Sequence, residues 1–208
     1  MIFRTLKTTQ ISDCIYAVKT AISNFYIYDT GNNLIAFDTG MNQLLSDAGM
    51  KKLGLAPERV SHVFLTHSDY DHVGGLKLFK NAAVFISKME EPMVTGQKAR
   101  MLIKYNMKIK GYTALDDRQI VNIDDASIQI IEAPGHTIGS ACYLINDSIL
   151  ISGDLLRTSK GGRITPFLFF QNMSHSDDKK SLRRLRDEGI IAKSSLILTG
   201  HTGMLNNR

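Results

Sequence analysis

The chain has 208 residues and a formal net charge of +5, with 43% hydrophobic and 22% charged residues. These values are typical of a globular protein, and we expect one domain over residues 1–208. No apolar run approaches the ~20 residues that span a bilayer, and the N-terminus lacks a signal-peptide core, so we expect a cytoplasmic protein that does not bind membranes. Its two cysteines form neither a disulfide framework nor a zinc knuckle. Basic residues are scattered, so no specific nucleic-acid binding is expected.

The first third of the chain alternates short apolar runs with turn-forming residues. Residues 11–18 and 21–28 are predicted antiparallel strands, and residues 29–33 predict a hairpin into a strand at 34–37. Residues 42–53 have helical spacing, with Asn42 as N-cap and Gly54 as the stop.

Asp-Thr-Gly occurs twice, at residues 29–31 and 38–40. An aspartic protease needs two such carboxylates to meet and share a proton. Two copies on one hairpin would lie at opposite ends of a strand, so we reject that function. Asp29 is expected to form a turn, whereas Asp38 ends its strand and can face a site.

A dense group of candidate metal ligands follows the next strand. The run at 63–65 is short, apolar and rich in β-forming residues, which predicts a buried strand. We expect a polar loop after it and then a helix at 73–79, entered through two glycines. Neutral imidazole and carboxylate oxygen are ligands that zinc, iron and manganese accept. The candidate ligands are His67, Asp69, Asp71 and His72.

Three more candidates each follow an apolar strand and a glycine: His136, Asp154 and His201. Their strands are predicted within residues 127–133, 148–151 and 196–198, with further strands at 120–123 and 140–145. Glycine lets the backbone turn sharply, so neighbouring strands could direct all seven side chains to one edge of a pair of sheets. The two remaining histidines, His62 within a strand and His175 near a helix start, are expected to be structural.

Two segments leave alternatives open. Residues 96–118 are predicted to be helical or irregular, and their basic residues form either a solvated face or a lid over the site. The unusually apolar run at 166–170 is core, a pocket wall or a contact between subunits, which leaves the oligomeric state open, a homodimer included. The basic residues of the first segment are Lys98, Arg100, Lys104, Lys108 and Lys110.

Five motifs together resemble the metallo-β-lactamase-fold hydrolase superfamily over nearly the whole chain. They are Asp38-Thr39-Gly40, the run from Thr66 to Gly75, the run from Pro134 to Ser140, Ser152-Gly153-Asp154 and Thr199-Gly200-His201. The resemblance implies an α+β fold, an αββα four-layer sandwich of two mixed β-sheets with helices on the outer faces. It also implies a dinuclear metal site at one edge.

The resemblance assigns the ligands to two ions. It places His67 and His136 at the first ion, places Asp71, His72 and His201 at the second, and makes Asp154 a bridge. Position 69 departs from the family pattern, because the common residue there is histidine and this chain has Asp69. A carboxylate adds a harder, negatively charged oxygen. We therefore expect two divalent ions with zinc favoured, and we keep Asp69 among the ligands, with iron or manganese open.

The implied chemistry is hydrolysis of a small-molecule substrate. A metal-bound water, its pKa lowered to about 7, would attack an ester, thioester, lactone or phosphoester, with Asp71 as the catalytic residue that orients it or accepts its proton. The carboxylate at position 69 keeps a mononuclear non-haem iron redox enzyme, such as a sulfur dioxygenase, as an alternative. The third possible function is that of a metal-stabilised binding protein without catalytic activity.

A basic segment follows Asp154, with Arg157, Lys160 and Arg163 flanking two glycines. Arginine suits carboxylate and phosphate groups because its planar fork can donate two charge-assisted hydrogen bonds. The segment is either a solvated loop or a loop that holds an anionic group of the substrate.

Overall fold

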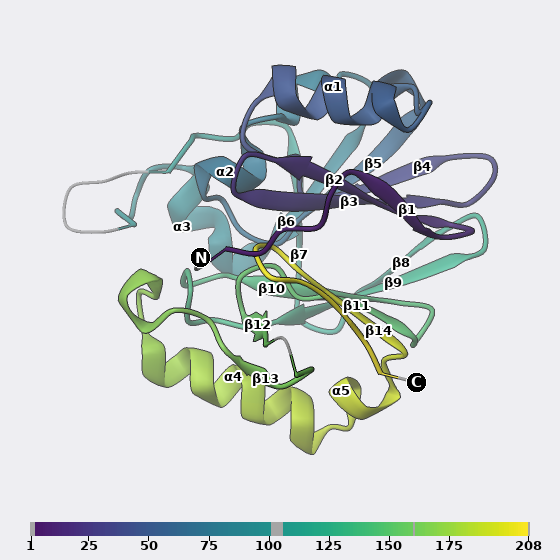
Figure 1. The fold of residues 1–208 in the computed structure, drawn as a ribbon. Helices are drawn as coiled ribbons and strands as arrows, with labels where there is room; N and C mark the ends of the chain where they lie inside the picture. Colours follow the sequence, from purple (N-terminus) through teal and green to yellow (C-terminus); the bar gives the residue numbers. More distant parts are fainter. Residues whose placement is uncertain (1–2, 101–105, 160, 208) are drawn as a thin grey trace.

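A computed structural model describes residues 3–100, 106–159 and 161–207. Two β-sheets pack face to face with helices outside them, which gives four layers (Figure 1). The first sheet has the order β1 (Thr9–Ser12), β2 (Ile15–Thr20), β3 (Ser23–Asp29), β4 (Leu34–Phe37), β5 (Val60–Leu65), β6 (Ala83–Ser87) and β7 (Tyr112–Leu115). Its pairings are antiparallel from β1 to β4 and parallel from β4 to β7, so the sheet is mixed.

The second sheet is also mixed. Its order is β15 (Gly203–Asn206), β14 (Leu196–Thr199), β11 (Ile149–Ile151), β10 (Ala141–Ile145), β9 (Ala126–Glu132) and β8 (Ile120–Ile123). The pairing of β11 with β14 is parallel and the others are antiparallel. A small hairpin of β12 (Leu156–Thr158) and β13 (Ile164–Pro166) forms a separate two-stranded sheet. The predicted αββα sandwich of two mixed sheets is confirmed.

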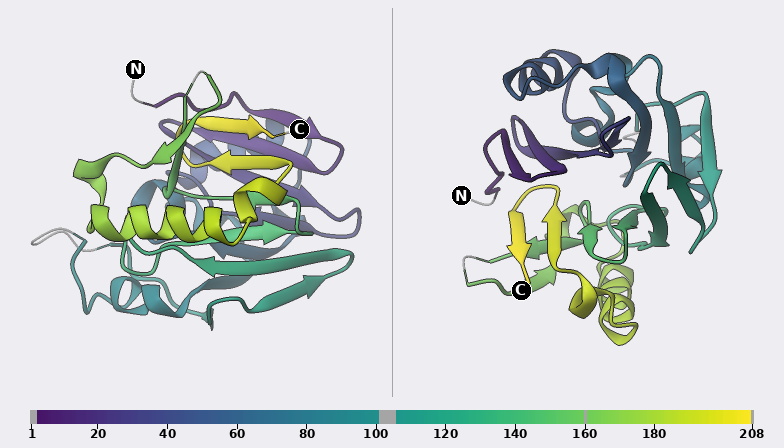
Figure 2. Two further views of the ribbon diagram at one scale, coloured as in Figure 1. Left: turned by 90° about the horizontal axis from the view of Figure 1, so that it is seen from below. Right: turned by 90° about the vertical axis from the view of Figure 1, so that its right-hand side faces the viewer.

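The helices lie on the two outer sides. α1 (Gln43–Lys52) covers the first sheet, while α4 (His175–Asp187) and α5 (Ile190–Lys193) cover the second (Figures 1 and 2). Two short helices, α2 (Tyr70–Val73) and α3 (Glu91–Val94), lie in the connections after β5 and β6. As predicted, Asn42 caps α1 by accepting from the backbone N–H of Leu45, and Gly54, with φ +70°, follows its end. None of the helices in the described ranges is long and apolar enough to span a membrane.

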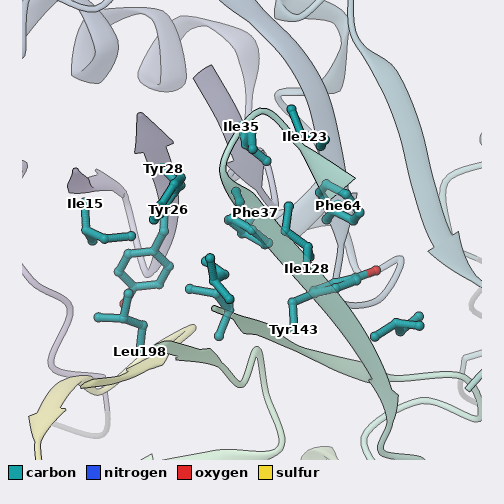
Figure 3. Packing of buried hydrophobic residues seen from close by; sticks show 14 of the residues in the cluster. Ile15, Tyr26, Tyr28, Ile35, Phe37, Phe64, Ile123, Ile128, Tyr143 and Leu198 are labelled. Atoms are coloured by element: carbon teal, nitrogen blue, oxygen red, sulfur yellow. The ribbon is translucent and has the colours of Figure 1, made fainter. Parts of the chain in front are cut away.

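Strand β3 shows why the core has three layers. Every residue from Ser23 to Tyr28 is buried, because both faces of the sheet are covered. Side chains alternate along a strand, so Tyr26 and Tyr28 pack between the sheets while Phe25 and Ile27 pack toward α1. Figure 3 shows the layer between the sheets, where Tyr143 meets aromatic rings of the first sheet. A third layer joins the second sheet to α4 through Leu182 and Leu185.

Four local predictions were wrong. The strand expected at 11–18 is broken by a turn after Ser12, and the strand at 196–198, the final one that we predicted, is followed by β15, which pairs with it. Part of the expected helical or irregular segment at 96–118 is strand β7, which adds to the edge of β6. The helix expected at 73–79 begins instead at Tyr70 and gives way to a 3-10 turn at Leu76–Leu78. The glycine pair between them packs tightly: a Cβ on Gly74 would lie 1.9 Å from the carbonyl oxygen of Met41.

Candidate metal centre

Strand direction explains how residues far apart in sequence meet. β9 is antiparallel to β10, β10 is antiparallel to β11, and β11 is parallel to β14, so β9, β11 and β14 end at one edge. His136, Asp154 and His201 follow these three ends, while His67 follows β5 of the other sheet. Hydrogen bonds that join the sheets there include those from the Tyr143 hydroxyl to the Leu65 carbonyl and from Ala141 N–H to the Thr66 carbonyl, both 2.8 Å.

The predicted ligands form two groups. Within each group, one ligand atom per residue lies within 4.8 Å of the others. Two members, Asp71 and His72, lie on helix α2 rather than on the loop that we expected. The first group is His67, His136 and Asp154, and the second is Asp71, His72 and His201.

Two of the imidazoles are fixed through Asp38. Its carboxylate accepts hydrogen bonds from the Thr66 hydroxyl, at 2.9 Å, and from Nδ1 of His72, at 2.8 Å. Because the Thr66 hydroxyl donates its only proton to Asp38, it accepts a hydrogen bond from Nδ1 of His67, 2.9 Å away. Nδ1 therefore carries the proton in both rings, which leaves the Nε2 lone pairs of His67 and His72 directed at the site.

The other two imidazoles have the same arrangement with different partners. Nδ1 of His201 donates to the carbonyl oxygen of Ile22, at 2.7 Å, and Nδ1 of His136 donates to the side-chain oxygen of Asn172, at 3.2 Å. Histidines that bind metal ions typically donate their other ring N–H to such a partner, which fixes the tautomer and the ring orientation. All four Nε2 atoms thus converge as lone-pair donors.

Several buried polar atoms in the site have no partner within the described part of the chain. Nε2 of His67 and Oδ1 of Asp154 make no hydrogen bond there. Nε2 of His72 and Nε2 of His201 lie 3.4 Å apart. Buried acceptors without donors destabilise a fold, and two imidazole nitrogens this close need a cation, either a proton or a metal ion, between them. A metal ion supplies that partner, so these residues fit one, and their nitrogen and oxygen atoms are ligands that zinc accepts.

The charges in the site favour a cation as well. Burial would raise the pKa of Asp154, but His201 and His72 hold it well below its usual range, so the carboxylate stays charged. Burial would lower the pKa of His72, but Asp154, Asp71 and Asp38 raise it well above its usual value. For His67 burial dominates and lowers the pKa well below its usual value, which keeps this imidazole neutral and ready to bind a metal ion.

The groups open into a cavity of about 180 Å³. The ring of Phe3 forms part of its wall and lies 4.6 Å from the ring of His201, measured between centroids. Phe167 of the apolar run at 166–170 is buried against the rings of His136 and His201 and does not line the cavity, whereas Phe169 and Phe170 of that run are exposed. The lining residues are Phe3, Ile22, Asp69, Asp71, Arg100, His136, Asp154, Gln171 and His201.

The sequence model of the metallo-beta-lactamase superfamily matches residues 18–201, which contain every proposed ligand. The chain belongs to the metallo-beta-lactamase superfamily. Among its curated relatives is a probable polyketide biosynthesis zinc-dependent hydrolase of Bacillus subtilis, 36% identical over 104 residues, or 48% of this chain and 40% of that protein. A probable metallo-hydrolase of Methanocaldococcus jannaschii is 27% identical over 156 residues, or 74% of this chain and 63% of that protein.

Solved structures agree on the fold of this superfamily member. A subclass B3 metallo-beta-lactamase with an active-site glutamic acid aligns with a TM-score of 0.71 at 21% identity, over 96% of this chain and 80% of that one. At this identity the likeness concerns the fold alone. The chain spans less than two thirds of the length of the curated relatives named above.

Asp69, where this superfamily member departs from the common pattern, lies beside the first group. Its Oδ2 is 3.1 Å from Nε2 of His136 and 3.8 Å from Nε2 of His67. Its oxygens also accept from Nε of Arg100, at 2.9 and 3.0 Å, and Asn106 donates to Oδ1 at 2.9 Å. Ligation by Asp69 stays a prediction.

The other residues that we considered for the site lie outside the two ligand groups. Arg157 donates to the carbonyl of Pro166 and, like the exposed Arg163, does not line the cavity. Lys160 and Lys104 lie outside the described residues, and Lys98, Lys108 and Lys110 are exposed. Neither His62 nor His175 belongs to the two ligand groups: His62 stacks on Phe85, and His175 begins α4 with its Nδ1 3.4 Å from the side-chain nitrogen of Asn172, the partner of His136.

Glu90 is a residue of the site that we did not predict. It is buried and accepts from Ser68 N–H, the Ser68 hydroxyl, the Thr137 hydroxyl and Gly139 N–H at 2.6–3.0 Å. It thereby joins the loop of His67 to the loop of His136. Burial raises the pKa of Glu90 to about 6, and the hydrogen bonds from Ser68 and Thr137 oppose that rise. No motif or periodicity in the sequence marks it.

Gly200 shows that a glycine can serve a site by its small size. A Cβ there would lie 2.4 Å from Oδ1 of Asp154 and 2.8 Å from Cε1 of His72. We expect Gly200→Ala to displace these ligands and weaken zinc binding at least tenfold, measured by competition with a chromophoric chelator. Gly161→Ala is the control, because a Cβ at Gly161 meets no atom of the described residues closer than 4.0 Å. Equal zinc affinity in the two variants would contradict the tight fit.

Proposed function

We propose that this chain is a metal-dependent hydrolase of small ester, thioester, lactone or phosphoester substrates. The observation that carries the proposal is the set of four imidazoles whose Nδ1 atoms are all bonded outward and whose Nε2 atoms converge beside Asp71 and Asp154. The B. subtilis and M. jannaschii relatives, named as hydrolases, support the same reaction class.

The residues have separable roles. Asp71, His72, His201 and Asp154 would hold a metal ion, which when bound lowers the pKa of a coordinated water and polarises a carbonyl or phosphoryl oxygen of the substrate. Asp71 is partly exposed and lines the cavity, 3.3 Å from Nε2 of His201, so its carboxylate can orient the attacking water and accept its proton. Phe3 lines the cavity beside His201, and Phe167 is buried against the rings of His136 and His201, so the two aromatic rings keep water from one side of these imidazoles.

Neither alternative function gains support from the geometry. An iron redox enzyme is an alternative because of the carboxylate at position 69, but that carboxylate accepts hydrogen bonds from Arg100 and Asn106. A non-catalytic binding protein has no specific observation in its favour, since Asp71 faces the cavity.

Metal content provides the first test. We expect the purified protein to carry at least one zinc ion per chain and His201→Ala to lower that content, because His201 supplies an inward Nε2. His72→Ala should lower it too, with an additional loss of stability because Asp38 then loses a buried partner. His62→Ala is the control, because His62 stacks on Phe85 and is in neither ligand group. Full metal content by elemental analysis in both ligand variants would contradict the assignment of these residues.

Activity provides the second test. A panel of chromogenic esters, thioesters, lactones and phosphodiesters should give at least one substrate whose hydrolysis is abolished by chelation and restored by zinc. Asp71→Asn should lower kcat by about 10²- to 10⁴-fold, the range typical of a general base. A protein that binds zinc fully yet hydrolyses none of these classes would favour the binding protein instead.

A further inference from the structure

Arg100 places a positive charge inside the candidate metal centre. Its side chain is 5% exposed, although it comes from the segment after α3 and not from any of the five motifs. Arginine is rarely buried unless it is paired. Here Nε donates to both oxygens of Asp69, and Nη2 donates to the carbonyl of Gln171.

The guanidinium of Arg100 also contacts His136, one of the candidate ligands of the first group. Nη2 of Arg100 and Oδ2 of Asp69 each lie 3.1 Å from Nε2 of His136. This nitrogen therefore either accepts a hydrogen bond from the arginine or donates one to the carboxylate. In both cases it is already engaged and is not free to coordinate a metal ion. A divalent ion among His67, His136 and Asp154 would also lie close to a fixed positive charge, which repels it.

The second group has neither obstacle. Nε2 of His201 lies 3.0 Å from Asp154 and 3.3 Å from Asp71, so two carboxylates face this position. Nε2 of His72 lies 3.4 Å from Asp154 and 3.7 Å from Asp71. No lysine or arginine among the described residues is paired with any member of this group. A divalent ion there meets only neutral or negative ligands.

We propose that Arg100 takes the place of the first metal ion, so that the chain binds one ion tightly, in the group of Asp71, His72 and His201 with Asp154. This inference rests on the proposed function, because it assigns the charges of the same site. Nη1 of Arg100 is buried without a hydrogen-bond partner in the described ranges, and the residue lines the cavity. Its N–H groups can therefore donate to the substrate oxygen that becomes negative during hydrolysis, the place where the chemistry needs a positive charge.

The test counts zinc ions. Chelator-stripped protein is titrated with zinc against a chromophoric chelator, and retained zinc is measured by elemental analysis after desalting. The wild-type protein should keep one ion per chain, with any second ion bound at least tenfold more weakly. Arg100→Met should keep two, because His136 and the first group become free. Lys98→Met is the control: it removes an exposed charge from the same segment and should keep one ion.

A second variant keeps the test valid if Arg100→Met fails to fold. Arg100→Met leaves Asp69 buried without its partner, whereas Asp69→Asn/Arg100→Met removes both charges and leaves His67, His136 and Asp154 in place. This double variant should also keep two ions. Two tightly bound ions in the wild-type protein, or one ion in both Arg100 variants, would overturn the inference while the metal-dependent hydrolase stands. No bound zinc in any of these proteins would overturn the proposed function and this inference with it.

Discussion

Asp38→Ala should weaken zinc binding about ten- to a hundredfold and lower the free energy of unfolding by about 3 kcal/mol. Asp38 is 2% exposed, and its carboxylate accepts from Thr66 N–H, the Thr66 hydroxyl and Nδ1 of His72. Alanine leaves these buried donors unpaired and releases the ring of His72. Zinc affinity from chelator competition and urea unfolding of the metal-free protein measure the two effects separately.

Asp38→Asn separates the metal effect from the stability effect. The asparagine oxygen can still accept from Thr66, but its NH₂ group would face Nδ1 of His72 and push the proton of that ring to Nε2. Zinc affinity should therefore fall nearly as far as in Asp38→Ala, while stability falls less. Asp29→Ala is a matched control from the other Asp-Thr-Gly, because Asp29 accepts from Gly31 N–H in an exposed turn. Equal zinc affinities in Asp29→Ala and Asp38→Ala would refute this role of Asp38.

The fold could be predicted because its motifs stand at the ends of buried strands. Short apolar runs, each ended by glycine or a polar residue, predicted most strands of both sheets, and Asn42 predicted the start of α1. The errors came where local pattern and tertiary packing differ. The glycines after Val73 resemble a helix entry, but their small size is required by the backbone of residues 39–41. Strand β7 has too short a run to stand out from the segment around it.

The candidate ligands could be predicted from sequence, but their partners could not. His136, Asp154 and His201 share a strand-glycine pattern that remains visible without a structure. Asp38 and Asp29 stand in identical tripeptides, and only the parallel pairing of β4 with β5 places Asp38 beside Thr66. Arg100 meets Asp69 across 31 positions, from a segment without periodicity, so its role depends wholly on tertiary structure.

Asp178→Asn should stabilise the metal-free protein at pH 8 and have little effect near pH 4. Asp178 is fully buried in α4, and neither carboxylate oxygen has a hydrogen-bond partner in the described part of the chain. Burial raises the pKa of Asp178 to about 7, while His136 opposes that rise. Asparagine has nearly the same shape and cannot ionise.

The direction in which stability changes with pH follows from proton binding. Between its unfolded pKa, 3.8, and its folded pKa, about 7, Asp178 keeps in the folded state a proton that the unfolded chain has lost. Stability therefore falls as the pH rises through this window and levels off above it, by roughly 4 kcal/mol for a shift of about three pKa units. Urea unfolding at pH 4, 6 and 8 with EDTA present should show this decline in the wild-type protein and in Asp187→Asn, an exposed control in the same helix. In Asp178→Asn the decline should shrink by most of that amount, because a group that cannot ionise gives no pH dependence. A decline as steep as in the wild-type protein would show that another group causes it and that Asp178 is charged in the folded state.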